Sequence, residues 1–406
     1  MTPSLLVQLV VVSLGIASAR AAKDDDGCSR VVTFNAGLIN RVPEYEKRAQ
    51  RVPQALLDLD ADVYCLQEIW LESDLRPLLD EVSSTYPYHY SVLHHSVGQL
   101  TKPRQRGVLG SLRASLTAGS ACSVRDLPYF MSSLACAASH GCLTNFTSDP
   151  IKSAACLVQE CRGWLQSDNL SADCIACVFL MGTSPTTAFD KCTKTPFQHS
   201  KRLNAPGLVL LSKKEVKSAC YRSFFPEQDL TIQRGYIQAD IDGLGTVICT
   251  HLSAQTDHYL EYNLQYPSYG VQQTAEIQSL LELASDWPPH VLLGDLNSGL
   301  AQHISNTSDN DTAVCSELPE NYQLLLDAGY TEPYSEQDGR CTFCDSNPLT
   351  DYCSITIDQV LLMGGHLEAL EAKRILDETD PSGLPLSDHY GVEATLCPSE
   401  TSGEPQ

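Results

Sequence analysis

Positive charge is scarce in this sequence. Of its 406 residues, 27 are Lys or Arg and 50 are Asp or Glu, so the formal net charge is −23. Nucleic-acid binding depends mainly on Lys and Arg side chains that neutralise phosphates. The shortage argues against a protein held on nucleic acid by its overall charge. It does not exclude a nuclease, because a bound metal ion can supply positive charge locally.

Long apolar segments are also missing. Beyond the N-terminal run described next, no stretch approaches the roughly 20 apolar residues that a transmembrane helix needs. The mainly apolar run from Leu5 to Ile16 is followed by Ala17-Ser18-Ala19. This pattern is typical of a secretory signal peptide over residues 1–19, although the basic residues that usually precede the apolar run are lacking. We therefore expect a secreted, extracellular protein without a transmembrane segment.

Cysteine, in contrast, is abundant. The 17 cysteines exceed what a protein of the reducing cytosol needs, and they predict disulfide bonds. Four sites for N-glycosylation fit the same compartment: Asn145, Asn169, Asn306 and Asn310. Together these features predict a secreted, disulfide-bonded glycoprotein.

The odd cysteine count leaves at least one thiol unpaired within the chain. Cys65 and Cys249 lie inside apolar strand-like runs, where we interpret them as free, buried thiols that act as small hydrophobic residues. Cys28 and Cys397 flank the first and last expected strands, and we predict a disulfide between them.

Residues 96–204 interrupt the pattern of the rest of the chain. Short helix-like stretches replace strands there, and eight cysteines predict a self-contained disulfide framework whose connectivity the sequence leaves open: Cys122, Cys136, Cys142, Cys156, Cys161, Cys174, Cys177 and Cys192. Cys174-x-x-Cys177 resembles half of a zinc site, but no second pair with suitable spacing accompanies it. We therefore favour disulfides over zinc.

Outside this segment, short apolar strands alternate with helical patterns. Strands are predicted near 30–35, 62–68, 88–93, 207–212, 234–241, 246–252, 290–295, 356–362 and 387–396, and helices near 44–59, 72–82, 271–284 and 321–328. Strict strand–helix–strand repetition is absent, which argues against a single parallel sheet. The fold class predicted is α+β, with two packed sheets flanked by helices and a cysteine-rich helical insertion.

Polar residues follow each of several apolar runs, so a buried element would deliver each of them to a sheet edge: Asn35, Glu68, His251, Asp295, Asn297, Asp358, Asp388 and His389. Each alone has an ordinary structural explanation, since a lone Glu is usually solvated and Asp or Asn often begins a turn. Asp358 is harder to explain this way, because a carboxylate within an apolar strand needs a partner. Asp295 and Asn297 are two residues apart, so on an extended strand they would point the same way. Jointly these residues predict a site at a sheet edge.

The motifs resemble the endonuclease/exonuclease/phosphatase superfamily, in order and without omission: Phe34-Asn35, Leu66-Gln67-Glu68, Thr250-His251-Leu252, Gly294-Asp295-Leu296-Asn297, Ile357-Asp358 and Ser387-Asp388-His389. The resemblance implies a four-layered α/β sandwich of two packed, mostly antiparallel sheets. It also implies Mg²⁺-dependent hydrolysis of phosphoesters, with another divalent cation as an alternative. It also implies a catalytic domain of residues 28–95 and 205–397, interrupted by the insertion 96–204 and followed by a flexible tail, 398–406.

The resemblance further implies a metal site. Glu68 would be the principal ligand, Asn35 would lie beside it, and Asp388 would complete the acidic group. Such a set is chemically reasonable, because Mg²⁺ prefers a few carboxylate or amide oxygens and retains several waters.

The remaining residues would carry out the chemistry. The resemblance implies that Asp295 binds or orients the attacking water, that Asn297 holds a phosphate oxygen and that His251 contacts the phosphoryl oxygens of the transition state. His389 would be the general base or a phosphate-contacting imidazole, held in one tautomer by Asp358. Whether Asp295 or His389 takes the proton stays open.

Three stretches resemble the neutral sphingomyelinase-like branch more than the pancreatic deoxyribonuclease branch: Pro206–Lys213, Arg234-Gly235-Tyr236 with Thr250-His251-Leu252, and Gln272–Gln278. The expected reaction is therefore cleavage of the phospholipid sphingomyelin, at a membrane surface, to ceramide and phosphocholine. A secreted deoxyribonuclease-like endonuclease acting on nucleic acid is one alternative. A non-catalytic binding protein or toxin acting through the insertion is another.

One local stretch bears on the substrate. Residues 82–125 contain no acidic residue but five basic ones: Lys102, Arg104, Arg106, Arg113 and Arg125. This basic stretch would suit contact with a lipid headgroup or a nucleic-acid backbone. A solvated loop explains it equally well.

Overall fold

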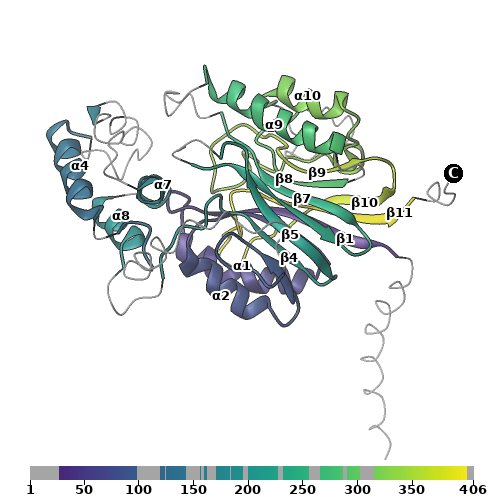
Figure 1. Cartoon of the computed structure of the whole chain (residues 1–406), viewed down its shortest axis with the longest axis horizontal. Coiled ribbons are helices and arrows are strands. Elements are labelled where there is room, and N and C mark those ends of the chain that lie inside the picture. The colour runs from purple at the N-terminus through teal and green to yellow at the C-terminus, as the bar shows by residue number, and fades with distance from the viewer. Residues whose placement is uncertain are drawn as a thin grey trace, which may run out of the picture.

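The chain folds around two β-sheets, as a computed structural model shows (Figure 1). The structure describes residues 27–97, 119–123, 125–142, 156, 160–161, 171–182, 184–194, 200–226, 232–255, 266–286, 290–301 and 315–399. Several expectations fall outside these residues. They concern the signal peptide, the four glycosylation sites, four of the five basic residues of the basic stretch and most of the C-terminal tail.

The first sheet has six strands in the order β10-β11-β1-β2-β4-β3 among the described residues. Their bounds are β1 Ser29–Leu38, β2 Val63–Ile69, β3 Tyr88–Tyr90, β4 Val209–Ser212, β10 Leu367–Ile375 and β11 Gly391–Pro398. Only β1 and β2 run parallel, and the other neighbours in this sheet are antiparallel. The central β1 and β2 are almost wholly buried, which explains why they read as continuous apolar runs.

The second sheet has five strands in the order β5-β6-β7-β8-β9 in the described part of the chain. Their bounds are β5 Val216–Ser223, β6 Gly235–Ile241, β7 Gly245–His251, β8 His290–Asp295 and β9 Asp358–Met363. Again one pair, β7 with β8, is parallel and the others are antiparallel. The expectation of mostly antiparallel sheets is therefore confirmed.

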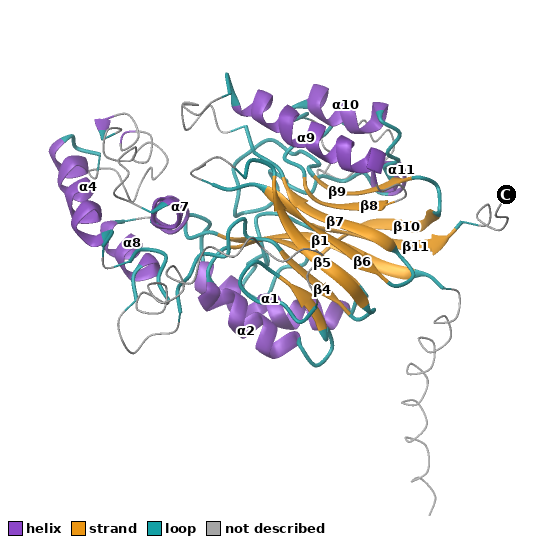
Figure 2. Cartoon of the chain, viewed as in Figure 1, coloured by secondary structure: helices purple, strands orange, loops and turns teal. Residues whose placement is uncertain are grey.

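Helices cover the outer face of each sheet (Figure 2). Helices α1 (Tyr45–Leu59) and α2 (Glu72–Val82) lie over the first sheet, and α9 (Tyr269–Asp286) and α10 (Pro319–Asp327) lie over the second. The short α11 (Pro333–Gln337) follows α10.

Alternating side chains along each strand fill successive apolar layers. Val32 packs under the first helix layer, whereas its neighbour Val31 packs between the two sheets. A third apolar layer, containing Ile277 and Leu292, joins α9 to the second sheet. Three apolar layers between four layers of secondary structure confirm the predicted sandwich.

The insertion forms a helical unit beside the sandwich, built from α4 (Leu127–Ser139), α7 (Ala172–Met181) and α8 (Pro185–Cys192) (Figure 1). Its eight cysteines bond only among themselves: Cys122–Cys174, Cys136–Cys161, Cys142–Cys156 and Cys177–Cys192. Both thiols of the Cys174-x-x-Cys177 motif are thus in disulfides, which excludes zinc there. The apolar side of α7 is buried. In the parts of the chain that the structure describes, no helix is long and apolar enough to cross a membrane.

The insertion contacts the sandwich at the segments that follow β1 and β2. The backbone N–H and the side-chain amide of Asn40, which follows β1, donate to carbonyls at the end of α7 (3.3 and 3.1 Å). Where the insertion returns to the sandwich, Arg202 donates twice to the buried Glu72 carboxylate (2.7 Å each). His94 also contacts Glu72 at 2.8 Å. Arg202 is the main reason that the pKa of Glu72 is well below its ordinary value. A charge-assisted network of this kind fixes the entry and exit of the insertion.

The remaining cysteines include one correction. Cys65 and Cys249 are not free thiols, because they bond to each other between the two sheets. The predicted Cys28–Cys397 bond is confirmed. All 17 cysteines lie in the described residues, and Cys220 alone is free.

Candidate functional site

The predicted site residues meet at one edge of the paired sheets. Strand register aligns His251 with Asp295 and Asp295 with Asp358 across β7, β8 and β9. Strands β7 and β8 end at this edge, whereas the antiparallel β9 begins there at Asp358. Asp388 and His389 likewise precede β11. The expectation that every site residue follows an apolar run is therefore wrong for these three, because antiparallel strands bring their beginnings to the same edge.

Asp295 is the centre of the site. Its Oδ2 accepts a hydrogen bond from Asn35 Nδ2 (2.8 Å), which joins the two sheets. Its Oδ1 accepts the backbone N–H of Asn297 (2.9 Å). Asp295 therefore caps a local turn through its Oδ1, and its Oδ2 faces the other site residues.

Asn297 does not extend β8, contrary to the expectation of a shared strand face. It has a φ of 46° in the left-handed region, which Asn tolerates better than most residues. Its side-chain Nδ2 donates to the Leu252 carbonyl (2.9 Å), after the end of β7. One amide proton of Asn297 is thus used structurally, and an amide group carries two.

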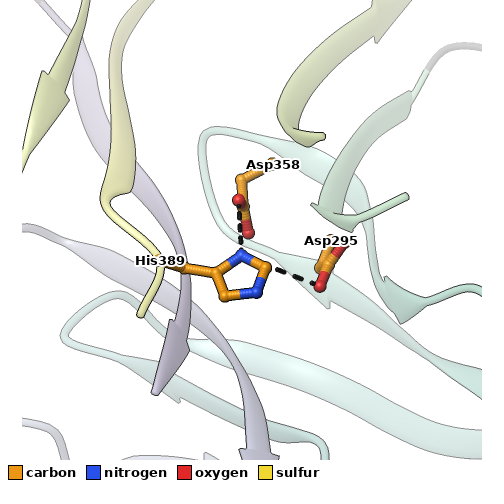
Figure 3. Close-up of side chains that lie close together, drawn as sticks. All are labelled: Asp295, Asp358 and His389. Carbon is orange, nitrogen blue, oxygen red and sulfur yellow. Dashed lines mark hydrogen bonds and ion pairs between the residues drawn. The ribbon is translucent and has the colours of Figure 1, made fainter. Parts of the chain in front are cut away.

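His389 is held by Asp358. Its Nδ1 lies 2.9 Å from Asp358 Oδ2 and 3.9 Å from Asp295 Oδ2 (Figure 3). Among the described residues these three form one group whose possible metal-ligand atoms lie within 4.8 Å of one another. The Nδ1 contact with Asp358 occupies the imidazole nitrogen nearest the carboxylates, so we interpret the trio as a proton-handling group.

Electrostatics fix the charges of this group near neutral pH. Burial alone would lower the pKa of His389, but Asp358 and then Asp295 raise it well above its ordinary value. Burial opposes ionisation of Asp295, yet His251 and His389 hold its pKa below the usual range. The pKa of Asp358 is raised, first by burial and further by Asp295. These directions favour a protonated His389 beside an ionised Asp295.

His251 supports Asp295 from the other side. Its Nε2 lies 3.3 Å from Asp295 Oδ2, and both side chains are buried. Burial, with a further contribution from Arg234, lowers the pKa of His251 to about 4, so the imidazole is neutral near pH 7. The structure thus directs His251 Nε2 at the carboxylate of Asp295.

Glu68 and Asp388 form a second acidic group beside this trio. Burial raises the pKa of Glu68, and the charge of Asp388 raises it further, to about 7. Glu68 has a φ of 59°, an uncommon left-handed conformation at the end of β2. A Cβ at Gly37 would meet Asp388 Oδ1 at 2.2 Å, so only glycine lets the end of β1 approach Asp388 this closely.

This acidic group fits a divalent cation. Two interacting carboxyl groups are hard oxygen donors, and Asn35 aligns with Gln67, the residue before Glu68. Their mutual repulsion, shown by the raised pKa of Glu68, is the kind that a bound cation relieves. Ser387 Oγ donates to the Asn35 carbonyl at 2.8 Å, which ties the Asp388 segment to β1.

Arg234 is a site residue to which sequence analysis assigned no role. It directly precedes β6, where the next residue, Gly235, aligns with His251. Its side chain is only 8% exposed, and its Nη1 has no hydrogen-bond partner among the described residues. Burial lowers the pKa of Arg234, while the charges of Glu276, Glu68 and Asp295 act against this. The only sign of Arg234 in the sequence was its position as an arginine immediately before an apolar strand.

No protein-family model matches the chain. A search of curated proteins also finds no match. Solved structures are similar in fold. Sphingomyelinase C from Streptomyces griseocarneus is 16% identical, with a TM-score of 0.46 over 91% of this chain and 99% of that one. An endonuclease/exonuclease/phosphatase from Bacteroides vulgatus is 14% identical, with a TM-score of 0.47 over 92% and 99%.

A third similar structure is TDP2 from D. rerio, described as complexed with a single-strand DNA product. It is 12% identical, with a TM-score of 0.46 over 91% of this chain and 99% of that one. Such similarities concern the fold alone. What this chain does has to be argued from its own residues.

Proposed function

We propose that this protein is a secreted, divalent-metal-dependent phosphodiesterase that cleaves sphingomyelin to ceramide and phosphocholine. The observation that carries the proposal is the cluster at one sheet edge, where possible ligand atoms of Asp295, Asp358 and His389 lie within 4.8 Å of one another. Glu68 and Asp388 interact electrostatically beside this cluster, and the buried Arg234 has an Nη1 with no hydrogen-bond partner among the described residues. The sphingomyelinase-like stretches and the net charge of −23 favour a lipid over nucleic acid as substrate.

Phosphodiester hydrolysis needs compensation of the negative charge on the phosphoryl group. Glu68, Asp388 and Asn35 would hold the cation, with Mg²⁺ as the favoured ion. A bound Mg²⁺ would stabilise the developing charge on the phosphoryl and leaving oxygens. Arg234 would direct its unpaired Nη1 toward a non-bridging oxygen, and Asn297 would use its second amide proton in the same way.

The charges of the two central residues separate their roles. His389 is already protonated near neutral pH, so it donates a hydrogen bond to a phosphoryl oxygen. Asp295 is ionised, and its carboxylate orients the attacking water and accepts its proton as the new P–O bond forms. The P–O bond to the ceramide oxygen breaks in the same step, and this oxygen leaves with a proton taken from solvent. Asp358 fixes the His389 ring. His251 and Asn35 hold the Asp295 carboxylate in place.

The decisive assay offers the purified protein sphingomyelin vesicles and plasmid DNA, each with Mg²⁺ and with EDTA. We expect EDTA-sensitive release of phosphocholine and little DNA cleavage. DNA cutting without lipid turnover would replace the proposal with the endonuclease alternative. Inactivity on both substrates would favour the binding-protein or toxin alternative.

Metal binding is testable without activity. Mg²⁺ at about one hundred times its Kd should raise the free energy of unfolding by roughly 2.7 kcal/mol, because it binds only the folded state. Glu68→Gln should abolish most of this increase. Differential scanning calorimetry of both proteins, with and without Mg²⁺, measures the effect. The exposed Glu371→Gln is the matched control. Equal stabilisation of Glu68→Gln and wild type would show that Glu68 is not a ligand.

Arg234→Gln should lower kcat/KM for sphingomyelin about 10- to 100-fold, because a charge-assisted hydrogen bond contributes roughly 1.5–3 kcal/mol. Arg234→Lys keeps the charge and should recover part of the loss. Steady-state kinetics on vesicles, with circular dichroism to verify folding, provide the measurement. A folded Arg234→Gln variant with wild-type kcat/KM would remove Arg234 from the site.

A further inference from the structure

A four-residue loop closed by a disulfide lies against the central trio. Cys341 and Cys344 are bonded to each other and fully buried, and they enclose Thr342 and Phe343. A ring this short restricts the unfolded chain far less than the longer rings of the other bridges, so it contributes comparatively little to stability. Its contacts with the site are therefore the more informative feature.

The loop holds the backbone that delivers Asp358. The backbone N–H groups of Thr342 and Phe343 both donate to the Ile355 carbonyl (3.0 Å each). The buried Thr342 hydroxyl then accepts the backbone N–H groups of Ile357 and Asp358 (3.1 Å each). Thr342 thus satisfies two buried donors just where β9 begins, and each would be costly to leave without a partner.

The same loop contacts His389. The rings of Phe343 and His389 lie 4.8 Å apart between centroids, inclined by 51°. The Thr342 carbonyl accepts the backbone N–H of Tyr390 (2.7 Å). Adjacent loop residues therefore touch both members of the Asp358–His389 pair, although the two belong to separate segments of the chain.

The buried guanidinium of Arg374 also contacts the loop. Arg374 Nη1 donates to the Cys341 carbonyl (3.1 Å) and approaches Cys344 Sγ (3.5 Å). Its guanidinium also lies over the Tyr390 ring, 4.7 Å from the centroid. The loop therefore contacts both Arg374 and the Asp358–His389 pair, and its disulfide limits the conformations that it can adopt between these contacts.

We propose that the bridged loop Cys341–Cys344 is the positioning element of the Asp358–His389 pair, and that its disulfide matters more for catalysis than for folding. This inference rests on the proposed phosphodiesterase function. Thr342 and Phe343 are positioning residues, since they act through Asp358 and His389. A misplacement of about 1 Å in a catalytic group can cost about 10²-fold in rate, which sets the scale of the effect.

The first test removes the bridge in the full-length protein. The double variant Cys341→Ala/Cys344→Ala should lose about 10- to 100-fold in kcat, with KM changed by less than about threefold and with little change in Tm. Cys142→Ala/Cys156→Ala, which removes a bridge of the insertion, is the matched control and should keep the wild-type kcat. Wild-type kcat in the loop variant, or an equal loss in both, would overturn the proposal.

The second test removes only the Thr342 hydroxyl. Thr342→Val should lower kcat about tenfold, because two backbone donors at the start of β9 lose their acceptor. Thr342→Ser keeps the hydroxyl and should retain most of the wild-type kcat. Equal kcat values for the Val and Ser variants would contradict a positioning role for this hydroxyl.

A readout independent of turnover separates this inference from the proposed function. In protein with ¹⁵N-labelled histidine, the Nδ1–H of His389 bonded to Asp358 should give a downfield proton resonance that His389→Asn removes. The loop variants should shift or broaden it. If wild type cleaves no phosphodiester but the loop variants still perturb this resonance, the proposed function fails and the positioning role stands. An unperturbed resonance in the double Cys variant would refute the positioning role itself.

Discussion

Replacing Asp295 with Asn is expected to lower kcat/KM for sphingomyelin by about 10³- to 10⁴-fold without unfolding the protein. The substitution preserves the shape of the side chain but removes the anion that accepts the water proton, and a positioned acid or base contributes about 10²–10⁴-fold. Its amide would also place a donor group near Asn35 Nδ2 and His251 Nε2, which now face the Asp295 carboxylate. The loss should therefore lie in the upper part of that range.

Steady-state kinetics on vesicles measure kcat/KM, and thermal unfolding measures the stability of the variant. Asp242→Asn, at an exposed hairpin turn between β6 and β7, is the matched control and should leave both unchanged. The double variant Asp295→Asn/His389→Asn should be scarcely worse than the poorer single variant, because groups that act as a unit are non-additive. A folded Asp295→Asn enzyme with more than about a tenth of the wild-type kcat/KM would exclude Asp295 as the proton acceptor.

Sequence analysis could identify the site residues because strand ends carry a clear local signal. Glu68, His251 and Asp295 stand at or next to the ends of β2, β7 and β8, and the register of these strands brings His251 and Asp295 together. The same reasoning misjudged Asp358, which begins its strand. Whether a polar residue begins or ends a strand depends on strand direction, a tertiary property that the local pattern does not contain.

The missed features share a physical cause. Strands β5 and β10 lie at sheet edges and carry exposed polar side chains, so their apolar periodicity is weak. Arg234 and Thr342 acquire their significance from an unpaired Nη1 and from two accepted backbone N–H groups. Such relations exist only after distant segments have packed.

The pairing of Cys65 with Cys249 was likewise invisible in the sequence, where each resembled an ordinary apolar residue. Cys65 lies on β2 of the first sheet and Cys249 on β7 of the second, within the apolar layer between them. Their bond therefore crosses the core of the sandwich. It lies close to the site, since β2 leads to Glu68 and β7 ends at His251.

Removing this bond should cause a large loss of stability. The bonded residues are 184 apart in sequence, and the chain-entropy relation gives roughly 5 kcal/mol for a ring of that length. Urea unfolding of Cys65→Ala/Cys249→Ala, compared with wild type, measures the change in free energy. Cys142→Ala/Cys156→Ala, whose residues are 14 apart, should lose only about 3 kcal/mol.

The two variants should also differ in activity at temperatures where both are folded. The first sheet provides Asn35 and Glu68, and the second provides His251 and Asp295, so the site depends on how the sheets are held together. Loss of the bond between the sheets should therefore reduce kcat, whereas loss of the insertion's bridge should not. If the two double variants lose equal stability and keep equal kcat, the Cys65–Cys249 bond has no special role in aligning the halves of the site.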